Sequence, residues 1–204
     1  MVCPQDIGQR ASLAYRKAQK AIWAGLAPDK YTRILPFVRG DRVLELGSAE
    51  GVLSLLLAER LHRVIGLEMR ADRHREAIRL QDHWLKKGRD VSSCHMMLGD
   101  IRDHMELLKE VDTLIAVRSI YYLREDAAKV MNAVYLAGVS QVILCGNRNR
   151  EAQSKAEPGT ELGRFNRLAS VSGMTELLEE AGFRIDQVVI KGDPIVIGER
   201  STRE

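Results

Sequence analysis

Residues 42–51 constrain the fold of this chain more than any other stretch. They read Arg-Val-Leu-Glu-Leu-Gly-Ser-Ala-Glu-Gly, and the apolar run in the first half is typical of a strand buried on both faces. Gly47 permits an unusual backbone turn close to a ligand, and Gly51 lets the next helix lie tight on the strand. A helix that begins near Val52 directs free N–H groups into the same turn. The stretch therefore predicts a ligand-binding turn between a strand and a helix.

Two later apolar segments also end in acidic residues. Residues 63–68 end in Glu68, about where a βαβ unit places a carboxylate to meet ribose hydroxyls. Residues 95–98 form a third strand pattern, which is followed by Gly99 and Asp100. We expect the tips of these successive strands to form the floor of one crevice.

These motifs resemble those of the class I methyltransferases that use S-adenosylmethionine. The first motif of that family, an acid followed by x-Gly-x-Gly-x-Gly, matches residues 45–51 except that Ala49 replaces the middle glycine, where the added methyl group crowds the cofactor slightly. By element order the match covers roughly residues 31–200. It implies S-adenosylmethionine as cofactor and S-adenosylhomocysteine as product. The first turn alone is also compatible with a nicotinamide-binding Rossmann domain. That alternative does not explain the Gly99-Asp100 ending or a C-terminal hairpin.

The resemblance also assigns cofactor roles to residues of this chain. It implies that the methionine part lies along the turn from Gly47 to Gly51, that Glu68 holds the ribose hydroxyls and that Met69 packs on adenine. It implies that Asp100 accepts a hydrogen bond from the adenine amino group. The residues expected to bind the cofactor are Glu45, Gly47, Ser48, Ala49, Gly51, Glu68, Met69, Asp100, Ile101 and Val117.

Three of these assignments have structural alternatives. Glu45 is either a cofactor contact, a solvated acid at a strand end or a residue behind the direct contacts. Glu68 is either the ribose ligand or a surface acid. Asp100 is either an adenine ligand or the N-cap of a helix that starts at Ile101, since Asp is favoured there.

Composition limits the class of protein. A chain of 204 residues suits one domain, and 45% hydrophobic with 29% charged residues is ordinary for a globular protein. The net charge of +3 is too small to indicate a nucleic-acid partner. The 3 cysteines lack metal-ligand spacing, so we expect no metal site and a reducing compartment. Without an evident signal peptide or an apolar run long enough to span a membrane, a cytoplasmic location is expected.

The remaining pattern predicts the fold class. Further strands are expected at residues 113–117, 142–145, 185–190 and 194–198, with helices between the earlier strands. The whole predicts an α/β fold: a Rossmann-like seven-stranded, mostly parallel sheet flanked by helices, with a C-terminal antiparallel hairpin. We expect a single methyltransferase domain over residues 1–204, with N-terminal helices in 1–40 and the cofactor-binding core in 41–204.

Two segments flank the expected acceptor pocket. Residues 9–26 read as an amphipathic helix, which either packs on the domain edge or forms a lid over cofactor and acceptor. Residues 149–171 are polar without sustained periodicity, and such a long connection is either mobile or functional. We expect this segment to be partly disordered without acceptor and to order with it.

No residue stands out as a general base. The methyl donor is already activated, so proximity and orientation, worth roughly 7 to 11 kcal/mol, make a dedicated base optional. The residues expected at the acceptor are Arg118, Tyr121 and Asn147. Arg118 either binds an acidic group of the acceptor or pairs with a structural acid. One tyrosine of the pair Tyr121 and Tyr122 is expected in the core, and Asn147 is alternatively a simple turn residue.

The acceptor itself is predicted only by class. Residues 118–121 stand where methyltransferases of nucleic-acid amines carry an Asn/Asp-Pro-Pro-aromatic motif, so those acceptors are disfavoured. We expect methyl transfer by in-line displacement to a hydroxyl of a small molecule or sugar. The alternatives are methylation of RNA or protein, with a contact surface of Arg148, Arg150, Arg164 and Arg167, or a module that binds the cofactor without catalysis. The sequence does not predict the oligomeric state.

Overall fold

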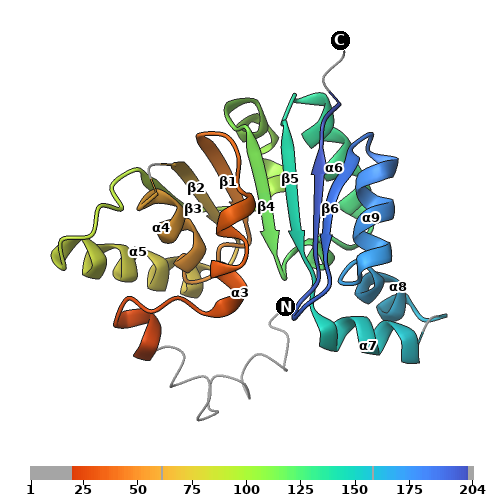
Figure 1. Cartoon of the computed structure of the whole chain (residues 1–204), viewed down its shortest axis with the longest axis horizontal. Coiled ribbons are helices and arrows are strands. Elements are labelled where there is room, and N and C mark those ends of the chain that lie inside the picture. The colour runs from red at the N-terminus through yellow and green to blue at the C-terminus, as the bar shows by residue number, and fades with distance from the viewer. Residues whose placement is uncertain (1–19, 61, 158, 202–204) are drawn as a thin grey trace.

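A computed structural model describes residues 20–60, 62–157 and 159–201 of the chain. It contains a seven-stranded sheet in the order β3-β2-β1-β4-β5-β7-β6 (Figure 1). The strands are β1 (Arg42–Leu46), β2 (Arg63–Glu68), β3 (Cys94–Leu98), β4 (Thr113–Val117), β5 (Gln141–Cys145), β6 (Arg184–Val189) and β7 (Ile195–Glu199). Strand β7 is antiparallel to both of its neighbours, and the other pairs are parallel. The predicted fold class is therefore confirmed, and each strand lies within one residue of its predicted bounds.

Helices cover both faces of this sheet. One hydrophobic core lies under α3 (Asp29–Thr32), η1 (Leu35–Phe37), α4 (Val52–Ala58) and α5 (Ala71–Lys86), where η denotes a 3-10 helix. The other core lies under η2 (Ile101–Asp103), η3 (Met105–Glu110), η4 (Ile120–Tyr122), α6 (Ala127–Leu136) and α9 (Val171–Glu180). Because successive strand side chains point to opposite faces, Val43 of β1 packs in the first core and Leu44 in the second.

The segment 149–171 differs from the prediction. Instead of an irregular connection it forms α7 (Arg148–Ala156) and α8 (Glu161–Arg167), and it ends where α9 begins. The side chains of Asn147, Thr160 and Ser170 each accept a hydrogen bond from a backbone N–H of the helix that follows. These N-caps stabilise the starts of α7 and α8, whose residues show almost no apolar period, and of α9, which buries Met174, Leu177 and Leu178. The expectation of an irregular connection is therefore wrong for the described residues, while ordering on acceptor binding stays a prediction.

Some of the expected helical regions contain short helices or helices of a different kind. Within the N-terminal region 1–40, which was expected to hold helices, α3 and η1 are two separate short helices, with Pro36 inside η1. Residues 101–110 form the 3-10 helices η2 and η3. Most of the amphipathic helix expected at residues 9–26 lies outside the described residues. Its described end is helical at residues 20–23, and the Trp23 ring packs edge-on against His83 of α5 at a centroid distance of 5.1 Å.

The carboxyl ends of the parallel strands define one edge of the sheet. The arrowheads of β4 and β5 point to this edge, near which α3 and α7 lie (Figure 1). In open α/β sheets ligands bind at this edge, where the strand order reverses. Here the reversal falls between β1 and β4, directly beside the turn at residues 47–51.

Candidate cofactor and acceptor site

The turn after β1 is held in a left-handed backbone conformation at three positions. Gly47, Ala49 and Gly51 have φ values of 70°, 52° and 74°. The backbone N–H groups of Gly47 and Ser48 donate to the Leu67 carbonyl of β2, at 2.8 and 3.1 Å. For alanine this conformation costs roughly 1 to 2 kcal/mol. The departure of Ala49 from the family motif therefore carries a backbone cost as well as an added methyl group.

Each of the two glycines leaves room for a different neighbour. A Cβ atom on Gly47 would lie 2.6 Å from the Cβ of Ser119, whose hydroxyl donates to the Leu46 carbonyl at 2.6 Å. A Cβ atom on Gly51 would lie 2.4 Å from the Met96 methyl group of β3. Gly47 thus lets the loop after β4 approach the turn, and Gly51 lets the start of α4 pack on the sheet.

Glu45 lies behind the turn. Its side chain is only 1% exposed, and its Oε2 accepts a hydrogen bond from the Ser54 hydroxyl of α4 at 2.5 Å. Burial raises the pKa of Glu45 to about 7, while the hydrogen bonds from Ser54 act in the opposite direction. Gly66 of β2 makes space for this pair, because a Cβ atom there would lie 2.7 Å from the Ser54 hydroxyl. The structure thus corresponds to the alternative in which Glu45 supports the turn from behind.

Glu68 connects the tip of β2 to the turn. Its Oε2 accepts the Ala49 N–H at 2.9 Å, and its Oε1 accepts the Arg70 N–H at 2.8 Å. Each carboxylate oxygen keeps a further lone pair for a ligand hydroxyl. The buried Ser48 hydroxyl has no hydrogen-bond partner among the described residues, and the Met69 side chain beside Glu68 is 60% exposed. Glu68 is therefore fixed in place at the turn and is not a freely moving surface acid.

Asp100 realises the capping alternative. Its side chain accepts from the Arg102 N–H at 3.0 Å and from the Arg102 guanidinium at 2.6 Å, so it caps η2. The hydrogen bond from the Arg102 side chain holds the pKa of Asp100 below its usual value. The same guanidinium also binds Asp126 at 3.0 Å. Ile101 and Val117 are buried, at 4% and 8% exposure.

On the acceptor side, Arg118 is paired with an acid that the sequence analysis did not identify. Arg118 has a φ of 55°, and its backbone N–H donates to the Cys145 carbonyl at 2.8 Å. Its Nε donates to Asp193 Oδ2 at 2.6 Å. Asp193 stands in the turn between β6 and β7 and also accepts the Arg148 N–H at 3.4 Å. The only sequence signal for Asp193 is its place in the hairpin turn Lys-Gly-Asp.

Tyr121 and Asn147 do come together. Tyr121 is 4% exposed and Tyr122 is 53% exposed, so one tyrosine of the pair lies in the core as expected. Burial raises the pKa of Tyr121, and a hydrogen bond with the Asn147 side chain opposes that shift. The Arg150 guanidinium of α7 lies 4.6 Å from the centroid of the Tyr121 ring and donates to the Asn166 side chain at 2.9 Å. Helices α7 and α8 are therefore tied to η4 at the mouth of the acceptor side.

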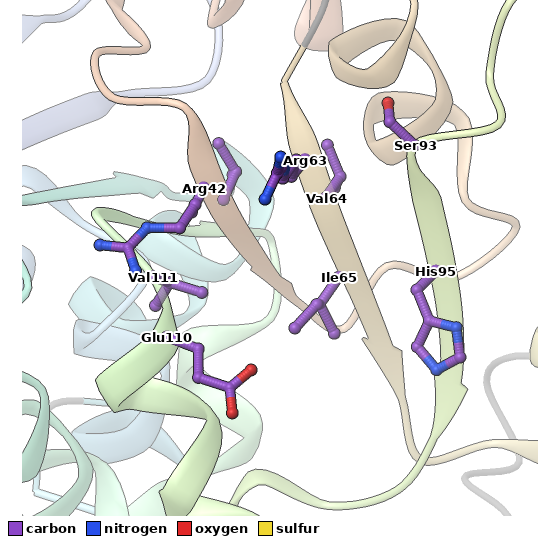
Figure 2. A pocket seen from close by; sticks show the side chains of 9 residues that line it. Arg42, Arg63, Val64, Ile65, Ser93, His95, Glu110 and Val111 are labelled. Carbon is purple, nitrogen blue, oxygen red and sulfur yellow. The ribbon is translucent and has the colours of Figure 1, made fainter.

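Two hollows lie away from this edge. One of about 500 Å³ opens at the amino ends of β1, β2 and β3, and Figure 2 shows Arg42, Ile65 and His95 around it. The other, of about 250 Å³, lies between α6, α8 and α9. Both are separate from the turn and from Glu68. Across the described ranges there is no cluster of three residues placed to hold a metal ion and no helix that meets the length and hydropathy of a membrane span.

Comparisons with known proteins agree with this geometry. Among solved structures, a SAM dependent methyltransferase from Aquifex aeolicus is similar at TM-score 0.63 and 15% identity, covering 97% of this chain and 98% of that one. The magnesium protoporphyrin IX methyltransferase of Synechocystis PCC 6803 with bound SAH gives TM-score 0.62 and 16% identity, covering 94% and 89%. The N-terminal domain of EvdMO1 with SAH bound gives 0.60 and 17%, covering 86% and 82%.

The similarity at these identities concerns the fold. None of the curated protein sequences matches the chain. The profile of a family described as a methyltransferase domain matches residues 15–188, which is most of the sequence. With the seven-stranded sheet and its glycine turn, this match shows that the chain belongs to the class I S-adenosylmethionine-dependent methyltransferases.

Proposed function

We propose that this enzyme transfers the methyl group of S-adenosylmethionine, by in-line displacement, to a hydroxyl of a small molecule or sugar. The binding of the cofactor is supported by one observation above all: Glu68 is hydrogen-bonded to the backbone of the glycine turn. Glu68 is fixed by two backbone N–H groups, and each of its carboxylate oxygens keeps a further lone pair for a ligand. A ribose with two neighbouring hydroxyls is a suitable ligand for such a carboxylate.

The residues of the turn fit the rest of this cofactor. Gly47 presents no side chain, and the buried Ser48 hydroxyl lacks a partner among the described residues. Met69 offers exposed apolar surface where the adenine would lie. The Asp100 carboxylate is hydrogen-bonded to Arg102 and would use its remaining lone pairs to accept a hydrogen bond from the adenine amino group. We assign the cofactor-binding role to the turn, Glu68, Met69 and Asp100 on these grounds.

The bound cofactor supplies a methyl group on a sulfonium, which needs no further activation. The protein then has to position the acceptor and exclude water, and alignment alone can lower the barrier by roughly 7 to 11 kcal/mol. Tyr121 and Asn147 lie close together beyond the tips of β4 and β5, where their polar groups can orient a hydroxyl. Helices α7 and α8 close the same side.

Three of the four arginines considered as a macromolecular contact surface, all except the exposed Arg164, are engaged within the protein, which favours a small acceptor. Arg148 donates to the Ile190 carbonyl at 2.9 Å, and Arg150 donates to Asn166 at 2.9 Å. Arg167 is paired with Glu176. Side chains engaged within the protein in this way are poor candidates for an RNA or protein contact surface. Because EvdMO1 was crystallised in the presence of SAH and D-fucose, sugars are the first class to test.

The test is methyl transfer from radiolabelled S-adenosylmethionine into fractionated cell extract. We expect label in a fraction of small, hydroxyl-bearing molecules with wild-type enzyme and a loss of at least about tenfold with Glu68→Gln. Glu76→Gln, an exposed acid on α5, is the matched control and should leave the transfer unchanged. Label that enters only RNA or protein would contradict the small-molecule acceptor.

A further inference from the structure

Three cationic side chains gather at the tips of β4 and β5. Lys30 lies in α3, Arg33 caps the end of α3, and Arg118 follows β4. The charges of all three act on the thiol of Cys145, the last residue of β5, and favour its ionised form. Burial and Asp193 act more strongly in the other direction and raise the pKa of this thiol to about 12.

The acids around these cations are already engaged. Asp193 binds the guanidinium of Arg118, and Glu50 is paired with Arg73 at 3.5 Å. Glu45, the third acid whose charge reaches Lys30, is buried against Ser54. Each carboxylate near the cluster thus has a partner other than Lys30 and Arg33.

Lys30 and Arg33 themselves are incompletely satisfied. The Lys30 ammonium lies 4.4 Å above the Tyr31 ring and makes no hydrogen bond or ion pair within the described part of the chain. Arg33 donates from Nη1 to the backbone carbonyl of Asp193 at 3.4 Å. Its Nη2 is buried and has no hydrogen-bond partner among the described residues. Burying a charged donor without a partner is costly, so this arrangement is suited to an incoming anion.

We infer that Lys30, Arg33 and Arg118 form a subsite for an acid group, a carboxylate or phosphate, carried by the methyl acceptor. This inference rests on the proposed function, because it states that the methyl acceptor of the same site carries a negatively charged group. Burial, and then the charge of Arg118, lowers the pKa of Lys30, while Glu50, Cys145 and Asp193 raise it. A bound anion would offset both lowering effects and keep the ammonium protonated.

The position of the cluster favours the acceptor over the carboxylate of the cofactor. Cys145 ends β5, which is separated from β1 by β4. Strands lie about 4.8 Å apart, so Cys145 lies about 10 Å along the sheet from the strand that carries the glycine turn. The charge of Lys30 also reaches Glu45 and Glu50 at that turn, so Lys30 forms the end of the cluster nearest the cofactor. Arg33 and Arg118 contact Asp193, which also accepts the N–H of Arg148 next to Asn147, so this end of the cluster lies on the acceptor side.

The test is a titration with sodium acetate and, separately, with inorganic phosphate at constant ionic strength, followed by amide chemical shifts in NMR. It is done on the protein alone and on protein saturated with S-adenosylhomocysteine. We expect saturable binding in both states. Lys30→Met should weaken it about tenfold, as expected for a lost hydrogen bond to a charged group. Lys129→Met, at an exposed lysine of α6, is the matched control.

Two results of this titration would overturn the anion subsite. Anion binding that disappears when S-adenosylhomocysteine is bound would assign the cations to the cofactor carboxylate and overturn the inference. No saturable binding would overturn it as well. If Lys30→Met does not fold, Arg33→Gln serves in its place, with Arg75→Gln on the exposed face of α5 as control. Failure of S-adenosylhomocysteine itself to bind would instead contradict the proposed function.

Discussion

The hydroxyl of Ser54 donates a hydrogen bond to Oε2 of Glu45 over 2.5 Å, and this buried pair joins α4 to β1 beneath the glycine turn. The motif acid thus fixes the start of α4 relative to the strand. Gly66 of β2 provides the space for the pair. The cofactor turn is therefore supported from behind by a carboxylate whose charge state changes near neutral pH.

This pair predicts a specific pH dependence of stability. Burial raises the pKa of Glu45 to about 7 in the folded protein, from an ordinary value of 4.5. Between these values the folded state holds a proton that the unfolded state has lost, so stability falls as pH rises through the folded pKa. The free energy of unfolding should decrease by about 3 kcal/mol between pH 4.5 and 8 from this group. Urea unfolding across this range should show a flatter profile for Glu45→Gln; equal slopes would contradict the prediction.

Removal of the Ser54 hydroxyl should destabilise the turn. In Ser54→Ala the buried Glu45 carboxyl loses its donor, and the loss should cost about 1 to 3 kcal/mol. The pKa of Glu45 should rise further, because the hydrogen bonds from Ser54 are the largest of the effects that lower it. Thermal unfolding of Ser54→Ala at pH 6 and pH 8 measures both effects. Ser172→Ala, near the start of α9, is a comparison that leaves the turn untouched.

Glu68→Gln should weaken cofactor binding without unfolding the protein. The Gln side chain has one acceptor oxygen where Glu68 offers two to the N–H groups of Ala49 and Arg70. We expect the affinity for S-adenosylhomocysteine to fall at least about tenfold, since hydrogen bonds to charged groups contribute about 1.5 to 3 kcal/mol. Calorimetry compares it with Glu76→Gln. An unchanged affinity would remove Glu68 from the site.

Asp193→Asn should lower methyl transfer without changing cofactor binding, because Asp193 lies on the acceptor side of the site. The change removes the carboxylate that holds Arg118, whose side chain is 41% exposed. Because solvent screens this pair, we expect a loss of about 1 kcal/mol or less in the free energy of unfolding. Binding of S-adenosylhomocysteine should be unchanged, while methyl transfer into extract should fall. A parallel loss of cofactor affinity would show that the two sides are not separate.

The sequence was sufficient for the elements with strong apolar patterns. The buried strands and the turn at residues 47–51 were predicted because continuous apolar runs followed by glycine have few alternative structures. Helices α7 and α8 were missed because their sides carry almost no apolar period. Their N-caps, Asn147 and Thr160, were the available signal. The prediction that one tyrosine of residues 121 and 122 lies in the core is confirmed.

The residues of the site that the sequence analysis missed are distant in sequence or ordinary in type. Arg33 and Asp193 are in contact although they are 160 residues apart in the sequence, and one sequence alone gives no sign of that contact. Ser54 is a polar residue in an apolar helix, and its role depends on the carboxylate it faces. Gly66 inside a strand was a usable signal for a close approach. Lys30 acquires its environment only when α3 lies against the strand tips.

The most direct measurement is calorimetric titration of the purified protein with S-adenosylhomocysteine and, in parallel, with a nicotinamide dinucleotide. We expect one saturable site per chain for S-adenosylhomocysteine, with an affinity that falls in Glu68→Gln, and no heat of binding for the nicotinamide dinucleotide. A titration with S-adenosylhomocysteine that shows no heat of binding, or saturable binding of the nicotinamide dinucleotide instead, would contradict the assignment of the turn and Glu68 to S-adenosylmethionine.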